Sequence, residues 1–242
     1  MKKIKQPFLP ILEKFDEQRN NISRLWNVGQ ETAELLSFLV MLHNQRIILE
    51  LGTSNGFSTF HLALPQTAKV ISIDVEKARQ DLARSNLQDF QHLELISDRI
   101  ENYLPKIDYQ IDLLFIDANK TNYLHYLLEL EKHLAENALI IADNIDSHTG
   151  NIKKYQEYVT ESDKYITIHL SIENGLLISR YQNKGNNMPR EKITFQEKNG
   201  TKVCKLLNPL VPSNPLPQTE QTNKTEDKPA KLTTEIKPEQ RG

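Results

Sequence analysis

An α/β fold with a mostly parallel sheet is predicted by three features of the sequence. Short apolar runs rich in β-branched residues recur through the first 181 residues, and helix-like segments separate them. Three of these runs end in an acidic residue, and a fourth has Glu50 directly before its last residue. Strands that alternate with helices form βαβ units, whose parallel strands end at the same edge of the sheet. We therefore expect a Rossmann-like sheet of seven strands, mostly parallel, with helices on both faces, an antiparallel edge strand and a disordered C-terminal tail.

The predicted strands and helices follow one another in a regular order. A helix over Gln30 to His43 precedes the first strand, and a helix over Lys120 to Leu134 carries an apolar stripe. A polar helix over about 150–162 leads to the last two runs, which are close enough in sequence to pair antiparallel at the sheet edge. The seven expected strands are 46–51, 69–74, 93–96, 112–117, 138–143, 165–170 and 175–180.

Composition predicts one globular domain followed by a different kind of sequence. The chain has 242 residues, of which 38% are hydrophobic, and this is enough for one substantial core. We expect that domain over 1–182 and a hairpin over 183–207, where Asn199 and Gly200 separate two alternating runs. Residues 208–242 contain six prolines and no aromatic residue, so they should form a disordered tail.

Charge and cysteine content argue against several classes of protein. The formal net charge of -2 gives no reason to expect a nucleic-acid or membrane-surface partner. The single cysteine, Cys204, rules out a disulfide framework within the chain. No apolar run approaches the ~20 residues that a membrane helix needs. The basic start of the chain is soon broken by Pro7, Pro10 and charged residues, so we expect a cytoplasmic protein.

The run "ELGTSNGF" places Glu50, Gly52 and Gly56 at the first strand-to-helix turn. Its spacing, G-x-x-x-G, differs from the dinucleotide and phosphate-loop patterns. Asp74 ends the next strand 22 residues after Gly52, where an acid usually binds ribose hydroxyls. Two acids would repel a pyrophosphate. The pattern therefore favours a cationic nucleoside such as S-adenosylmethionine.

These motifs resemble those of the class I S-adenosylmethionine-dependent O-methyltransferases, and in particular the bacterial family related to catechol and caffeoyl-CoA O-methyltransferases. "ELGTSNGFST" is similar to the family's first motif. "LLFIDANKTNYLHYL" matches its F-x-D-x-x-K-x-x-Y pattern, and "LIIADNIDSH" matches its A-D-N pattern. "WNVGQETAELLSFLV" resembles the helix that helps to close over the cofactor in this family. The resemblance covers about Asn20 to Tyr181.

The resemblance implies an enzyme that methylates a hydroxyl of a small catechol-like or phenolic acceptor. It places a divalent cation, usually Mg²⁺, on Asp117, Asp143 and Asn144, and it places the general base at Lys120. It also implies a homodimer. The implied cofactor-binding residues are Glu50, Gly52, Thr53, Ser58, Asp74, Ser97, Asp98 and Asp117.

The sequence departs from the family pattern at three positions. Asn137 stands in a turn where the family commonly has Gly-Gly, and it can keep the left-handed conformation. Ser97 replaces a glycine that often approaches adenine, and His148 follows the A-D-N triplet either as a surface residue or as a contact to substrate or metal. Two other functions stay open, namely a nucleotide-dependent oxidoreductase and a protein that binds the cofactor without turnover.

Overall fold

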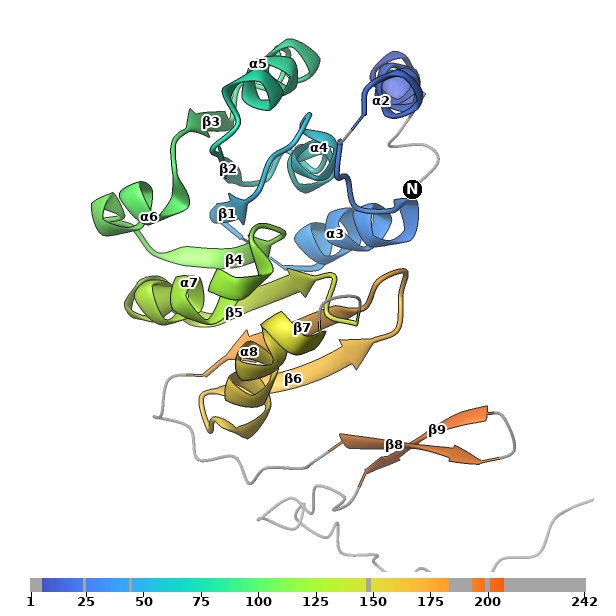
Figure 1. The fold of residues 1–242 in the computed structure, drawn as a ribbon, viewed down its shortest axis with the longest axis vertical. Helices are drawn as coiled ribbons and strands as arrows, with labels where there is room; N and C mark the ends of the chain where they lie inside the picture. The colour runs from blue at the N-terminus through green and yellow to red at the C-terminus, as the bar shows by residue number, and fades with distance from the viewer. Residues whose placement is uncertain are drawn as a thin grey trace, which may run out of the picture. The chain divides into compact units, whose positions relative to one another are not determined.

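A seven-stranded sheet organises the first part of the chain (Figure 1). The computed structural model describes residues 6–23, 25–43, 45–146, 149–182, 193–198 and 201–206. The chain divides into two units, 1–189 and 190–242, which are considered separately. In the first unit the strand order is β3-β2-β1-β4-β5-β7-β6. The strands are β1 (Ile47–Leu51), β2 (Lys69–Asp74), β3 (Leu93–Ser97), β4 (Ile111–Ile116), β5 (Leu134–Asp143), β6 (Tyr165–Leu170) and β7 (Leu176–Tyr181).

The sheet direction agrees with the prediction. Strands β1 to β5 pair in parallel, whereas β7 runs antiparallel to both β5 and β6. The strand that opposes the others is therefore the one inserted between β5 and the edge strand β6. From β1 the chain builds outward to β2 and β3, and then returns to β4 on the other side of β1. Such a reversal leaves a crevice at the carboxyl ends of the strands, where ligands bind in folds of this type.

Helices cover both faces of the sheet, as expected (Figure 1). Successive side chains of β4 illustrate this, because Leu113 and Phe115 enter one core and Leu114 and Ile116 enter the other. The first core is covered by α2 (Leu9–Asn21), α3 (Gln30–Leu42), α4 (Phe57–Ala63) and the segment that follows α5 (Lys77–Asn86). The second is covered by α6 (Ile100–Tyr103), α7 (Tyr123–Leu130) and α8 (Thr149–Glu161). Single 3-10 turns are η1 (Gln6–Phe8), η2 (Leu104–Lys106), η3 (Lys120–Asn122) and η4 (Glu131–His133).

The helix predicted over Lys120 to Leu134 is shorter than expected. The α-helix covers only α7, and 3-10 turns precede and follow it. The Asn119 side chain accepts from the Thr121 N–H at 3.2 Å, and this local bond tightens the first turn. Leu134 is buried as its periodicity predicted, but it is the first residue of β5. Asn137 has a φ of 67°, so the left-handed turn expected there is present within β5.

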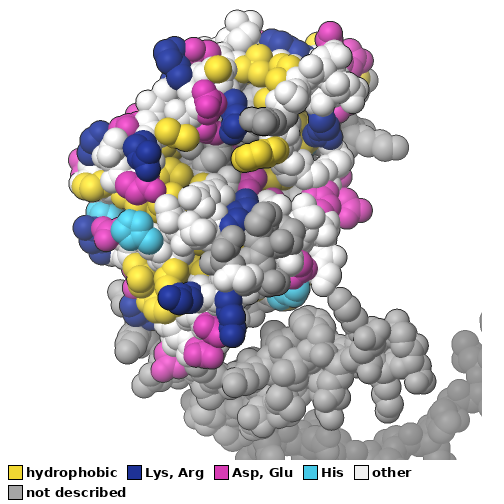
Figure 2. All heavy atoms as spheres, viewed as in Figure 1, with side chains coloured by type: hydrophobic (Ala, Val, Ile, Leu, Met, Phe, Trp, Pro, Cys, Tyr) yellow, Lys and Arg dark blue, Asp and Glu magenta, His cyan; other side chains and the backbone are white. Residues whose placement is uncertain are grey.

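The second unit contains one described element, a two-stranded antiparallel hairpin of β8 (Ile193–Lys198) and β9 (Thr201–Leu206). Residues 208–242, where the tail was predicted, lie outside the described residues. No described helix has the length and apolar character needed to span a membrane. On the face of the first unit shown in Figure 2, acidic and basic side chains alternate over the described surface.

Candidate functional site

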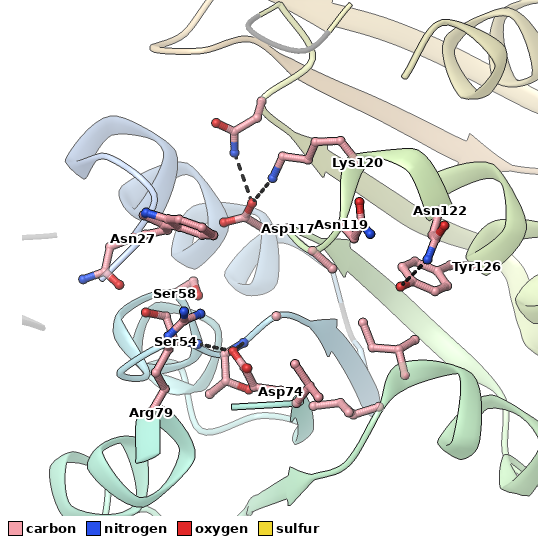
Figure 3. A pocket seen from close by; sticks show the side chains of 18 of the residues that line it. Asn27, Ser54, Ser58, Asp74, Arg79, Asp117, Asn119, Lys120, Asn122 and Tyr126 are labelled. Atoms are coloured by element: carbon pink, nitrogen blue, oxygen red, sulfur yellow. Dashed lines mark hydrogen bonds and ion pairs between the residues drawn. The ribbon is translucent and has the colours of Figure 1, made fainter. Parts of the chain in front are cut away.

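A cavity of about 910 Å³ opens at the carboxyl ends of the central strands, at the crevice that the strand order predicts (Figure 3). Its walls come from the β1–α4 turn, the ends of β2 and β4, the start of α7 and the segment before α3. The predicted residues that line it are Gly52, Thr53, Ser58, Asp74, Asp117, Lys120 and Asn144.

The β1–α4 turn requires glycine at position 52. Gly52 has a φ of 103°, and a Cβ there would overlap the backbone carbonyl oxygen of Asp117. Its N–H donates to the Ile73 carbonyl at 2.9 Å, so the turn is tied to the neighbouring strand β2. The glycine thus allows the ends of β1 and β4 to approach closely at the floor of the cavity.

Asp74 organises the same turn through its carboxylate. Its Oδ2 accepts from the backbone N–H of Thr53 at 3.2 Å and of Ser54 at 2.9 Å (Figure 3). Its Oδ1 accepts from the Glu76 N–H at 2.8 Å. Each carboxylate oxygen has further lone pairs. Asp74 can therefore shape the turn and still accept from ligand hydroxyls.

Glu50 lies behind the cavity and does not line it. The side chain is fully buried, and its Oε2 accepts from Thr59 and, at 2.5 Å, from Ser72. Burial raises the pKa of this carboxyl to about 7, although hydroxyl donors oppose the shift. Glu50 thus links β1, β2 and α4 beneath the turn.

Two polar side chains on the cavity wall have buried atoms without partners among the described residues. Both amide atoms of Asn27 and the Oγ of Ser54 are buried and make no hydrogen bond. A buried polar atom without a partner costs about 1–3 kcal/mol. A ligand that carries both donors and acceptors at this wall would remove that cost. The amino-acid end of S-adenosylmethionine is a ligand of this kind.

Four predicted residues meet near the other end of the cavity, of which Asp117, Lys120 and Asn144 line it and the buried Asp143 does not. The Nζ of Lys120 lies 2.6 Å from Asp117 Oδ1, and the Asn144 amide donates to the same oxygen at 3.1 Å (Figure 3). The Asn144 amide also donates to Asp143 Oδ2 at 2.7 Å. Burial, and next the nearby Asp117 carboxylate, raise the pKa of Asp143 to about 7. No group of three or more His, Cys, Asp or Glu side chains suited to a metal occurs among the described residues. The set that forms here is two carboxylates and one amide, and a hard cation accepts such oxygen ligands.

Besides Glu50 and Asp143, three predicted positions lie away from the cavity or outside the description. Ser97 accepts from Arg84 at 3.1 Å, and Asp98 accepts from Asn102 and Lys106, so both face neighbouring side chains and do not line the cavity. The binding roles assigned to them stay predictions. His148 lies outside the described residues.

Sequence reasoning did not identify several residues that line the cavity. Glu101 accepts from Tyr126 at 3.0 Å and from Asn122 at 3.1 Å, which forms a polar group beside Ile100. Trp26 is 71% exposed and is therefore no core residue, and its ring lies 5.4 Å from the guanidinium of Arg79. The "WNVG" run, which resembles the family's cofactor-closing segment, could have pointed to Trp26 and Asn27 as cavity residues. No sequence pattern distinguished Arg79 or Glu101 from ordinary surface charges.

The comparisons with known proteins agree with this geometry. A sequence profile of the O-methyltransferase family matches residues 5–178. Tapetum-specific methyltransferase 1 of Arabidopsis thaliana is 26% identical over 190 residues, which cover 68% of this chain and 81% of that protein. Catechol O-methyltransferase B of Danio rerio is 31% identical over 153 residues, which cover 57% of this chain and 56% of that protein. Caffeoyl-CoA O-methyltransferase 1 of Eucalyptus globulus is 27% identical over 172 residues, covering 61% and 70%.

Solved structures show the same fold. The O-methyltransferase of Bacillus cereus, in complex with SAH, matches with a TM-score of 0.63 and 22% identity, over 72% of this chain and 89% of that chain. The O-methyltransferase TomG of Streptomyces achromogenes, in complex with SAM, matches with a TM-score of 0.64 and 22% identity, over the same shares. At these identities the likeness concerns the fold alone.

Proposed function

Because the chain belongs to the O-methyltransferase family and is a methyltransferase, we propose that it transfers a methyl group from S-adenosylmethionine to a hydroxyl of a small catechol-like or phenolic acceptor, with the help of a divalent cation. The observation that carries this proposal is the meeting of Asp117, Lys120, Asp143 and Asn144 at one end of the cavity. The other end offers the ribose acid and the polar wall that the cofactor needs.

The cofactor fits the residues of the β1–α4 side. Asp74 would accept from the ribose hydroxyls, and Gly52 leaves the backbone open to the ligand. The buried, unpaired atoms of Asn27 and Ser54 would bind the amino-acid end. Asp117 lies between this side and the Lys120 group, and it would face the sulfonium charge. The absence of the G-x-G-x-x-G pattern argues against a nicotinamide dinucleotide.

The divalent cation fits the residues of the β4–β5 side. Asp117 and Asp143 would each contribute an oxygen, and Asn144 would contribute its amide oxygen after the amide turns away from its present donor contacts. Mg²⁺ prefers a few oxygen ligands and keeps several waters.

The residues of this chain then have distinct tasks. The cofactor supplies an electrophilic methyl group, and a divalent cation lowers the pKa of the acceptor hydroxyl. The side chain of Lys120 is mostly buried, and its Nζ lies at Asp117, so an acceptor bound beside Asp117 is within its reach. Lys120, as the neutral amine, takes the hydroxyl proton and becomes an ammonium, and the cavity walls hold the acceptor oxygen in line with the methyl group.

A melting and activity screen tests this function. S-adenosylhomocysteine should raise the melting temperature, whereas NAD should not. At a hundredfold excess over Kd, the ligand should add ~2.7 kcal/mol to the free energy of unfolding. A panel of catechols and other phenols should yield methylated product with Mg²⁺ and much less with chelator. Stabilisation by NAD alone would contradict the cofactor assignment. Full turnover in chelator, or in the Asp143→Ala variant, would contradict the role of the metal.

A further inference from the structure

Helix α2 packs on the domain through the half-buried Ile11 and Leu12, through Arg19 over the Phe57 ring, and through two buried side chains. Of its 13 residues, only Phe15 and Gln18 are buried. The Phe15 ring packs against the rings of Phe57 and Phe60 of α4, with centroids at 5.5 and 5.8 Å. This apolar contact explains why Phe15 is buried. Gln18 is the other buried side chain of α2, and a buried amide needs hydrogen-bond partners.

The Gln18 amide joins α2 to both α5 and the β1–α4 turn. Its Nε2 donates to Asn86 Oδ1 at 2.8 Å, and its Oε1 accepts from Asn86 Nδ2 at 2.9 Å. The same Oε1 also accepts from Asn55 Nδ2 at 2.9 Å, and Asn86 Nδ2 donates to the Asn55 carbonyl at 2.9 Å. Within the described part of the chain, the bond from Nδ2 to Gln18 is the single hydrogen bond of the Asn55 side chain, because the Asn55 Oδ1 has no partner.

The network ends at the residues that form the cavity. Asn55 is fully buried and follows Thr53 and Ser54, whose N–H groups bind the carboxylate of Asp74. Gly56, the next residue, has a φ of 89° and is the N-cap of α4. Gln18 therefore contacts the middle of the turn from behind, while the ligand side of the same turn faces the cavity. None of the three amides lines that cavity, so each can influence a ligand only through the turn.

We infer that Gln18 is a positioning residue for cofactor binding, which holds the β1–α4 turn in its binding shape from helix α2. This inference rests on the proposed function, because it takes S-adenosylmethionine as the ligand of the turn. Without Gln18, the Asn55 amide is buried with no partner. A shift of the turn that lets this amide reach water would then lower the free energy of the protein. Thr53, Ser54 and Asp74 then lose their common geometry. Gln18 thus adjusts cofactor affinity without touching the cofactor.

Calorimetry with S-adenosylhomocysteine tests the inference. Gln18→Met keeps the length and helix propensity of the side chain and removes both polar ends. It should raise Kd roughly tenfold. It should also raise the KM for the methyl donor while kcat at saturation stays unchanged, since the loss is in binding common to ground and transition states. Two matched variants serve as controls. Glu17→Met changes the exposed neighbour on the same helix, and Phe15→Leu weakens α2 packing but leaves the amides paired.

The controls decide between positioning and general stability. Equal Kd values for Gln18→Met and wild type would overturn the inference. An equal loss of affinity in Phe15→Leu would overturn it as well, because α2 would then act only through stability. Failure of the wild type to bind S-adenosylhomocysteine would count against the proposed function. The effect of Gln18 on the shape of the turn would then be tested by a measurement that needs no ligand.

That measurement is amide hydrogen exchange in the ligand-free protein. Gln18→Met should speed exchange at residues 53–56 by about tenfold, whereas Glu17→Met should not. If Gln18→Met does not fold, the wild type still provides a test through reciprocity of coupling. Binding of S-adenosylhomocysteine should then slow exchange throughout α2. Unchanged exchange at 53–56 in the variant, or in α2 on ligand binding, would overturn the inference.

Discussion

Lys120 is the residue that the proposed chemistry needs most, and its removal gives the sharpest prediction. Lys120→Met keeps the aliphatic stem and removes the proton acceptor, so kcat should fall ~10²–10⁴-fold, which is typical for a general base. The affinity for S-adenosylhomocysteine should change little, because under the proposal Asp74 and the turn would bind that ligand separately. Lys132→Met, at an exposed lysine of η4, is the matched control. Unchanged turnover on a phenol that the wild type methylates would exclude Lys120 as the base.

Glu50 predicts a dependence of stability on pH. Its folded pKa is about 7 and its ordinary value is 4.5, so between these values the folded protein holds a proton that the unfolded chain releases. Stability therefore falls as pH rises through this window, by up to about 3 kcal/mol. Glu50→Gln has no such titration. Urea unfolding of both proteins at pH 4.5 to 8 should show the wild type losing stability relative to the variant, and parallel curves would contradict the assignment.

Single residues also show how far the sequence predicts the site. Gly52, Asp74, Asp117, Lys120 and Asn144 line one cavity because strand-ending residues of a parallel sheet meet at one edge. The residues that were missed reach the cavity from less informative positions, such as the first turn of α5 or the start of α6. Whether a surface charge there faces the cavity or the solvent depends on packing between distant segments, which local patterns do not encode.

At the scale of elements, the β1–α4 turn should be far less tolerant of change than the open glycine position in α8. Gly52→Ala would place a methyl group on the Asp117 carbonyl at a φ of 103°, so it should separate the ends of β1 and β4 and cost several kcal/mol of stability. Gly150→Ala in α8 is the control, since a Cβ there meets nothing within 4 Å. It should stabilise the protein by roughly 0.5–1 kcal/mol. Comparable unfolding midpoints for the two variants would refute this reading of the turn.

The elements themselves were predicted unevenly. Parallel strands β1 to β5 follow from apolar runs flanked by turns, because buried strands carry that pattern whatever their neighbours. The position of β7 between β5 and β6 depends on pairing between Leu139–Asp143 and Leu176–Arg180, which no local signal reports. The length of α7 was overestimated because its apolar stripe continues into Leu134, where the same burial is achieved by a strand.

At the scale of the whole molecule, the resemblance to bacterial O-methyltransferases predicts a homodimer. The outer face of α3 exposes Phe38, Met41 and Leu42, at 48%, 39% and 60%, and a partner could cover these side chains. Light scattering at micromolar concentration should give about twice the chain mass of 28.0 kDa. A mass of one chain would show that this expectation is wrong.

The C-terminal segment gives the last prediction, which follows from composition. Residues 208–242 contain six prolines and no aromatic residue, so they have little apolar surface to bury. Deleting them should shift the melting temperature by less than about 2 °C, which corresponds to under about 1 kcal/mol for a domain of this size. S-adenosylhomocysteine affinity should stay the same. A chain that ends at residue 175 is the contrasting control, since it lacks β7, which pairs with both β5 and β6, and it should not fold. A large loss of stability in the first truncation would mean that the tail packs on the domain.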